Sequence, residues 1–497
     1  MPKLWNVGPH LICILVLTGV IGVVLLIAPG LLQSPEVVLG LSLAPLAVSL
    51  TLTCPVVLCT LFIIISHFRI HEAFPFLFPL HLPLVLAILS LLSVTIQILA
   101  GRVKFAWRPP LKFLTALFIC VVVSCIMSTN WDTSFTALGD FTKIYMMTFV
   151  ITWLVRKPTH FRFVTRAVII GGASVALMAL ENYATGSDLA GGRVGMGSPV
   201  KSSIGDPNDL CLVLLFAWSF ALAIIVIRPN FVDSLLALFA TPALLLAMVA
   251  TKSRGGLLGL VAVVLIIGLQ KCKSKSVLVM ACVALLAAMY LAMGIGDRVE
   301  SFEQGAVFDD SAQSRLNAWI AAIKMGIARP IWGVGLNTFP ENLWFFVTER
   351  WVGYFNMVAH STWLTVLAEI GVPGFVAFVM MVASTWRACR ENLDAIGSLH
   401  KSNALKVMSF GLMGGIAGFC ASGTFLSQAF AWPIYIFVGL TVSLSNYLDH
   451  LAKRDPSRLE DSSEWRSLKS GANQGAMLVC KTRISREVKT FAPRSLR

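Results

Sequence analysis

Long apolar runs separated by short polar segments recur along the whole chain. A helix needs about 20 predominantly apolar residues to cross the hydrocarbon core of a bilayer. The pattern predicts membrane-spanning helices at residues 11–29, 36–48, 50–66, 79–100, 112–128, 139–155, 163–181, 208–227, 232–250, 255–270, 276–294, 359–383, 406–422 and 426–447. In 31–66, Pro35, Pro45 and Pro55 allow either a short helix followed by a span or one kinked helix. The predicted fold class is therefore an all-α polytopic membrane protein with 12 to 14 transmembrane helices.

Composition supports this class independently of the pattern. Of 497 residues, 57% are hydrophobic and only 13% are charged, whereas about 25% charged residues are typical of soluble domains. The net charge of +14 does not indicate nucleic-acid binding, because the segments between the apolar runs lack a basic-aromatic binding signature. Basic cytoplasmic loops explain the charge instead.

Basic residues gather in alternate loops, which sets the orientation. These loops hold Arg102, Lys104, Arg108 and Lys112; Arg156, Lys157, Arg162 and Arg166; Lys271, Lys273 and Lys275; and Arg387, Arg390 and Lys401. By the positive-inside rule their side is cytoplasmic. The long segments 182–207 and 295–358 then face outward. No inner loop has the roughly 100 residues that a soluble nucleotide-sugar-binding domain needs.

We accordingly expect four regions. N-terminal transmembrane helices occupy 1–190, a central region that contains the outer loop 295–358 and the candidate site residues occupies 191–385, and C-terminal transmembrane helices occupy 386–448. The basic tail 449–497 is expected to be cytoplasmic and disordered past Asp455.

Two outer segments carry candidate binding residues. Lys252 and Arg254 sit at an outer helix end, and the glycine pair that follows Arg254 permits close approach of a backbone or a ligand; snorkelling to lipid headgroups is the alternative. Asp206 and Asn208 flank Pro207 at the start of another span. A helix cap explains these residues by itself, and a substrate-facing role remains open.

The outer loop is predicted to contain an amphipathic helix over 312–325, because Leu316, Trp319, Ile320 and Ile323 recur at helical spacing. A compact glycine turn at 329–335 follows it. The aromatic residues that come next fit either an interfacial belt or a lid over a sugar.

His360 opens the span that follows this loop. A histidine there can act as a general base, although a lone histidine is often only a satisfied polar residue. Glu369 lies about two and a half turns further along, so it points away from His360, and we expect it to bind a neighbouring helix. Outer arginines suit phosphate oxygens. Together with a histidine, and without clustered metal ligands or a cofactor motif, they fit transfer from a lipid-linked diphosphate to an alcohol.

The order of these segments resembles the O-antigen ligase and polymerase family over about 190–380. The residues that carry the resemblance are Ser253 to Gly256, Arg315 with Trp319, Pro330 to Gly335, His360 to Gly371, and the Asp-Pro-Asn at 206–208. Ser361 departs from the asparagine found in many relatives.

The resemblance implies a metal-independent inverting glycosyltransferase without a cofactor. Its catalytic residues would be His360, Arg254 and Arg315. The two arginines would hold the diphosphate, and Lys252, Asp206 and Asn208 would help to bind substrate. The choice of Arg315 over other loop arginines rests on the resemblance.

The expected partners are an undecaprenyl-diphosphate-linked glycan, membrane lipids and an acceptor. The expected location is the bacterial inner membrane, with the active site facing the periplasm. The acceptor is a glycan, lipid A-core or a protein, so ligase and polymerase are not separated. A polysaccharide flippase or secondary transporter is the alternative, but such proteins show repeats or broken, charged midplane helices, which this sequence lacks apart from Glu369.

Overall fold

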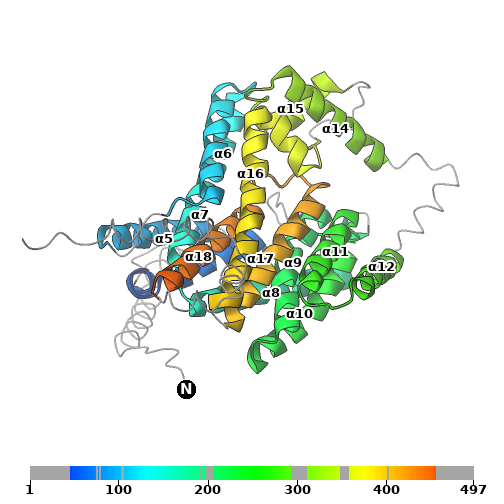
Figure 1. Ribbon diagram of the computed structural model, residues 1–497. Coiled ribbons are helices and arrows are strands. Elements are labelled where there is room, and N and C mark those ends of the chain that lie inside the picture. The colour runs from blue at the N-terminus through cyan, green and yellow to red at the C-terminus, as the bar shows by residue number, and fades with distance from the viewer. Residues whose placement is uncertain are drawn as a thin grey trace, which may run out of the picture.

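The computed structural model describes residues 45–73, 77, 80–101, 106–187, 189–190, 192–196, 205–292, 310–347, 357–399 and 402–454. Over these residues the chain is helical apart from turns, loops and one antiparallel pair of two-residue strands, β1 (Leu189–Ala190) and β2 (Arg193–Val194). The predicted all-α class is confirmed (Figure 1).

The helices are α3 (Pro55–Phe68), α4 (Ile70–Ala73), α5 (Leu82–Leu99), α6 (Pro109–Ile126), α7 (Trp131–Leu154), α8 (Pro158–Thr185), α9 (Pro207–Ile227), α10 (Phe231–Ala250), α11 (Arg254–Leu269), α12 (Lys275–Ala292), α14 (Asp310–Ala328), α15 (Phe339–Phe346), α16 (Thr362–Leu399), α17 (Asn403–Gly423) and α18 (Trp432–Arg454).

Seven of the described helices are long and apolar enough to cross a membrane. The number is eight if the helix Pro45–Thr53 and α3, which bend by 111°, form one span. Helices α11 and α12 are shorter apolar helices. The predicted run 11–29 lies outside the described residues, so the count of 12 to 14 stays a prediction, while the polytopic membrane class is confirmed.

Helices α7, α16 and α18 extend well beyond their predicted bounds at one end. Helix α7 begins at Trp131 because the side chain of Asn130 caps it by accepting a hydrogen bond from the Thr133 N–H. Helix α16 continues to Leu399, so most of the segment 384–405, which we expected to be a loop, is helical. Helix α18 runs to Arg454, and the tail beyond it lies outside the described residues.

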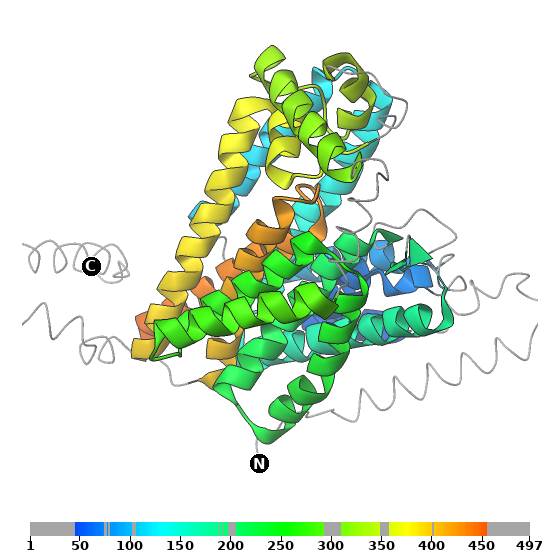
Figure 2. The ribbon, with the colours of Figure 1, turned by 90° about the vertical axis from the view of Figure 1, so that its right-hand side faces the viewer.

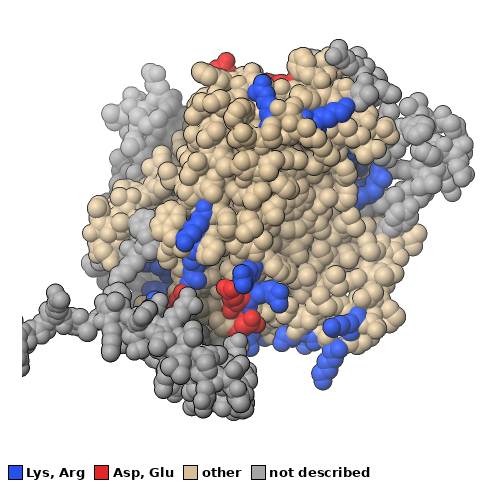
Figure 3. Space-filling view, turned by 45° about the horizontal axis from the view of Figure 1, so that its top comes forward, with Lys and Arg blue, Asp and Glu red and all other residues tan. Residues whose placement is uncertain are grey.

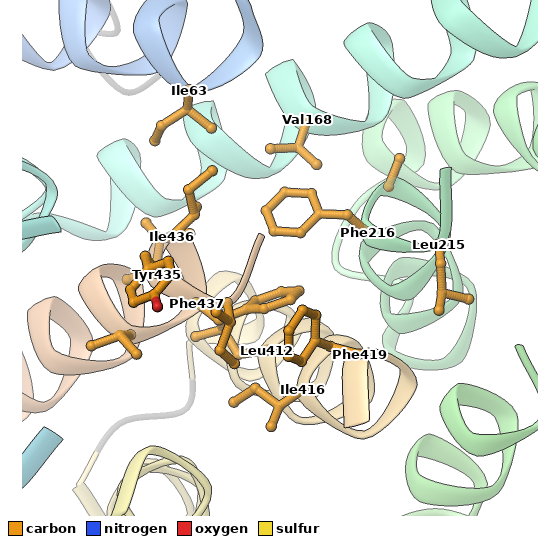
Figure 4. Packing of buried hydrophobic residues seen from close by; sticks show 14 of the residues in the cluster. Ile63, Val168, Leu215, Phe216, Leu412, Ile416, Phe419, Tyr435, Ile436 and Phe437 are labelled. Atoms are coloured by element: carbon orange, nitrogen blue, oxygen red, sulfur yellow. The ribbon is translucent and has the colours of Figure 1, made fainter. Parts of the chain in front are cut away.

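The main core lies where α3, α8, α9, α17 and α18 meet (Figure 4). The rings of Phe216 and Phe437 pack with centroids 4.6 Å apart. A side chain on Gly415 would place its Cβ 2.2 Å from the Phe437 ring. Small residues are what allow helices to approach closely in membranes, so the glycines of α17 let it run through the centre of the bundle.

Charged side chains tie one end of the bundle together. Arg108 at the start of α6 binds Asp449 and Asn446 of α18, and Arg166 of α8 binds Asp233 of α10. The visible face in Figure 3 carries charged residues near its ends and a broad uncharged area between them. This distribution is the one expected of a chain that crosses a bilayer.

The loop helices α14 and α15 lie together beyond the opposite end of the bundle, next to α16 (Figures 1 and 2). The amphipathic helix predicted at 312–325 is present as α14. Its buried side, however, is formed by Ala318, Ala321, Ala322 and Met325. The predicted apolar residues Leu316, Ile320 and Ile323 are 40% to 48% exposed. The side of α14 that faces α16 carries small side chains, and Gly326 of α14 packs directly against Leu367 of α16.

Candidate functional site

The glycine turn after α14 docks on a kink in α16. The kink lies at Gly371, which has φ 77°. Main-chain bonds replace those that the kink interrupts: Val372 N–H donates to the Pro330 carbonyl at 2.7 Å, and Gly335 N–H donates to the Glu369 carbonyl at 3.1 Å. A Cβ on Gly333 would lie 2.3 Å from the Glu369 backbone. The two glycine motifs of the sequence are therefore the two halves of one joint.

Glu369 fastens the same turn through its side chain. Its Oε1 accepts a hydrogen bond from the Phe339 N–H at 3.2 Å, and the Asn337 N–H also donates to the carboxylate. We expected this residue to bind a neighbouring helix, and it does so at the first residue of α15, Phe339, while Asn337 lies in the loop just before that helix.

Replacing Gly371 with alanine is expected to lower the melting temperature markedly. A residue other than glycine at φ 77° and ψ −175° costs about 1–3 kcal/mol, and the new Cβ would lie 2.7 Å from the Pro330 carbonyl oxygen. Thermal unfolding of the purified protein, followed by intrinsic fluorescence, measures the effect. Gly397→Ala on the same helix is the control, since nothing lies within 4 Å of its Cβ position. Equal melting temperatures for the two variants would contradict the joint.

His360 occupies the residue before the cap of α16. Its φ of 49° is left-handed, and Ser361 then caps the helix by accepting a hydrogen bond from the Leu364 N–H. This turn holds the half-buried imidazole at the mouth of the helix and not along its side.

Arg254 begins α11 in a similar turn. Lys252 has φ 48°, and the buried Ser253 caps the helix by accepting a bond from the Gly256 N–H at 3.1 Å. A Cβ on Gly256 would lie 2.1 Å from Cys211 Sγ of α9. The predicted close approach at the glycine pair is confirmed, and it leaves Arg254 exposed at a helix N-terminus, where the dipole favours anions.

Asp206 and Asn208 form the start of α9. Asp206 caps the helix, as predicted, by accepting the Asn208 N–H at 2.7 Å. Arg193 of β2 donates to Asn208 Oδ1 at 2.7 Å and to the Thr251 carbonyl at 3.0 Å. Arg193 therefore joins the start of α9 to the turn that carries Lys252 and Arg254. Sequence analysis missed this role, since nothing in the spacing of Arg193 announces a contact 58 residues away.

The segment 424–431 between α17 and α18 connects the remaining parts. Phe425 packs against Trp319 of α14 with centroids 6.0 Å apart, and Gly255 is small enough to lie against the same phenylalanine. The hydroxyl of Thr362 donates to the Leu426 carbonyl and accepts from the Gln428 N–H. This segment thus contacts α11, α14 and α16 near the three predicted catalytic residues.

The charges of Arg315 and Asp206 both act on His360. Burial and then the positive charge of Arg315 lower the pKa of His360 to about 4, while the negative charge of Asp206 acts in the opposite direction. The imidazole is consequently neutral near pH 7 and able to accept a proton. The ionisable groups from three distant parts of the sequence form one constellation.

The six predicted site residues therefore lie on neighbouring elements. The charges of Arg315 and Asp206 act on His360, and Asn208 is hydrogen-bonded to Asp206, whereas Arg254 and Lys252 are joined to them through Arg193 and the 424–431 segment. The buried side chain of Asn208 is already occupied by Arg193 and Asp206, so its substrate contact stays a prediction. Among the described residues, no group of three or more His, Cys, Asp or Glu is placed to hold a metal.

Comparison with known families matches residues 236–379 to the model described as O-antigen ligase. This range runs from α10 into α16 and contains Arg254, Arg315 and His360. No curated protein matches the chain. The resemblance inferred from the motifs is confirmed.

Proposed function

Because residues 236–379 match the O-antigen ligase family, we propose that the protein transfers a glycan from an undecaprenyl-diphosphate carrier to a hydroxyl acceptor at the periplasmic face of the bacterial inner membrane. The observation that carries this proposal is that the 424–431 segment contacts Trp319 near Arg315, Gly255 next to Arg254, and Thr362 near His360, and so brings the three helices that carry these residues together. A base and a phosphate-binding group are the two requirements of such a transfer.

In this reaction the acceptor hydroxyl oxygen attacks the anomeric carbon of the donor glycan. The bond from that carbon to the diphosphate oxygen breaks, and undecaprenyl diphosphate leaves with the bonding electrons. His360 takes the hydroxyl proton. Arg254, Arg315 and the N-terminus of α11 stabilise the charge that develops on the diphosphate. Lys252 adds a further cation beside Arg254.

Donor binding makes His360 a stronger base in this scheme. The charge of Arg315 helps to hold the pKa of His360 at about 4 in the free protein, which makes the imidazole a weak base. A diphosphate on Arg315 offsets that positive charge. The pKa of His360 then rises toward the operating pH, where general bases are most effective.

The pH profile tests this coupling. We expect kcat/KM for the donor to decline as the pH falls through about 4, and kcat to decline at a higher pH, because kcat reports the substrate complex. Asp206→Asn keeps a helix cap but removes the anion that raises the pKa of His360, so its kcat/KM limb should move to lower pH. If kcat/KM of the variant declines at the same pH as in the wild type, the decline cannot be assigned to His360.

The proposed function is tested by reconstitution in liposomes with purified undecaprenyl-diphosphate-linked glycan. Lipid A-core, a growing polysaccharide and a candidate acceptor protein are compared as acceptors, each with and without a chelator. Transfer to one of them supports the proposal and separates ligase from polymerase. Loss of activity with the chelator would overturn metal independence, and no transfer to any of them would overturn the function.

A further inference from the structure

A cavity of about 600 Å³ opens beside the first half of α7. It is distinct from the constellation around His360. Its lining consists of Asp132, Thr133, Thr136, Ala137, Asp140 and Phe141 of α7, Leu336 and Asn337 of the loop, and Phe430.

The polar residues of α7 form one face of that helix. Asp132, Thr136 and Asp140 are spaced four residues apart, so they extend for about 12 Å along one side. Carboxylate and hydroxyl groups need water, protein or a ligand to satisfy their hydrogen bonds. The cavity accounts for the placement of this polar face.

The chemistry of the lining suits sugar hydroxyls. Carboxylate and threonine oxygens accept hydrogen bonds from hydroxyl groups, and the Asn337 amide both donates and accepts. Lys143 forms an ion pair with Asp140 at 2.8 Å, while Asp132 lies at the first turn of the helix. The lining contains no cation. A diphosphate would therefore be repelled here, in contrast to the region of Arg254 and Arg315.

An aromatic floor completes the cavity. Phe430 packs edge-on against the buried Phe141 with centroids 5.3 Å apart, and Phe141 is fixed in turn by Tyr435 at 5.4 Å. The phenyl ring of Phe430 is half-buried and contributes to the lining. Polar side chains around an apolar ring match the two kinds of surface that a pyranose presents.

One short segment joins the cavity to the proposed active site. Gln428 bonds the hydroxyl of Thr362, two residues from His360, and its side chain bonds Asp209 near the start of α9. Phe430 follows Gln428 by two residues, which spans at most about 7 Å. Residues 428 to 430 thus connect the lining of the cavity to the backbone next to His360.

We propose that this cavity binds the glycan part of the acceptor, with its reactive hydroxyl directed toward His360. This inference rests on the proposed function, since it assigns the second substrate of that reaction. The cationic region takes the diphosphate of the donor, and the hydroxyl-rich glycan of the acceptor enters from the α7 side.

A blocking substitution tests the proposal. Thr136→Trp places an indole in the cavity, and Phe135→Trp is the matched control because Phe135 lies on the same helix, is 48% exposed and does not line the cavity. In the reconstituted system, Thr136→Trp should raise the acceptor KM at least about tenfold and leave the donor KM unchanged. Asp132→Asn should raise the acceptor KM by a smaller factor, since one charged hydrogen bond is lost.

The two KM values show whether the cavity binds the glycan of the acceptor or the glycan of the donor. A raised donor KM with an unchanged acceptor KM in Thr136→Trp would overturn the acceptor assignment and give the cavity to the donor glycan. Unchanged values for both substrates would overturn the site altogether.

Direct binding keeps this test independent of turnover. Saturation-transfer NMR on the detergent-solubilised protein uses two probes, the dephosphorylated oligosaccharide released from lipid A-core and the repeat-unit oligosaccharide released from the donor. We expect one of the two probes, the one that matches the acceptor, to bind the wild type and the Phe135→Trp control but not Thr136→Trp. If the wild type binds this probe without any transfer, the proposed function fails while the site stands; if the probe binds Thr136→Trp equally, the site fails.

Discussion

Replacing His360 with alanine is expected to reduce glycan transfer by a factor of about 10²–10⁴, the usual contribution of a positioned general base. The protein should still insert into the membrane, because the imidazole is half-buried at a helix mouth and contributes little to the core. Transfer from purified lipid-linked donor in liposomes measures the loss, and membrane fractionation measures insertion.

The left-handed backbone of His360 calls for a second variant. Alanine is strained at a positive φ, whereas asparagine tolerates this conformation. His360→Asn therefore preserves the turn before α16 and removes only the basic nitrogen. Equal losses in the two variants support the base, and full activity in His360→Asn would refute it.

The second large effect is expected at Arg254. Arg254→Ala should lower transfer by about 10²–10³, as is typical when one group that stabilises developing charge is removed. Arg254→Lys keeps the charge but loses the two-pronged geometry that matches a phosphate, so an intermediate loss is expected. Lys324→Gln is the control, because it removes a cation from the outer loop away from the Arg254 turn.

In cells, Arg254→Ala should cause lipid-linked repeat units to accumulate on the outer leaflet of the inner membrane. A transferase acts after the donor has crossed the bilayer, so its failure leaves the donor outside. Accumulation on the inner leaflet would instead indicate a flippase and would overturn the transferase. Leaflet-specific accessibility of the glycan to a lectin distinguishes the two results.

Helix formation was predictable for most of the described chain because long apolar runs leave no other stable structure in a bilayer. The caps at Asp206 and Ser253 and the close approach at Gly256 follow from local chemistry in the same way. The motifs also pointed to His360, Arg254 and Arg315, since the resemblance supplied partners that spacing alone does not.

Contacts between elements were harder to predict from the sequence. The buried side of α14 is a row of alanines, because contact with α16 demands small residues more than apolar ones, and no hydrophobic period reveals that preference. No motif in the sequence marks Arg193. Its hydrogen bond to the Thr251 carbonyl forms because β2 packs against the turn after α10. The polar face of α7 did leave a signal in the four-residue spacing of Asp132, Thr136 and Asp140, but our predicted span began at residue 139 and divided it.

The joint between the glycine turn and α16 also bears on how this scaffold can change over evolution. It is made of main-chain hydrogen bonds and of glycines that no larger residue can replace, so most of its side chains are not needed for attachment. Ile331, within the turn, is 61% exposed and can vary freely while Gly333 and Gly371 cannot. Substitutions on the exposed surface of the turn can therefore accumulate without loosening its attachment to α16.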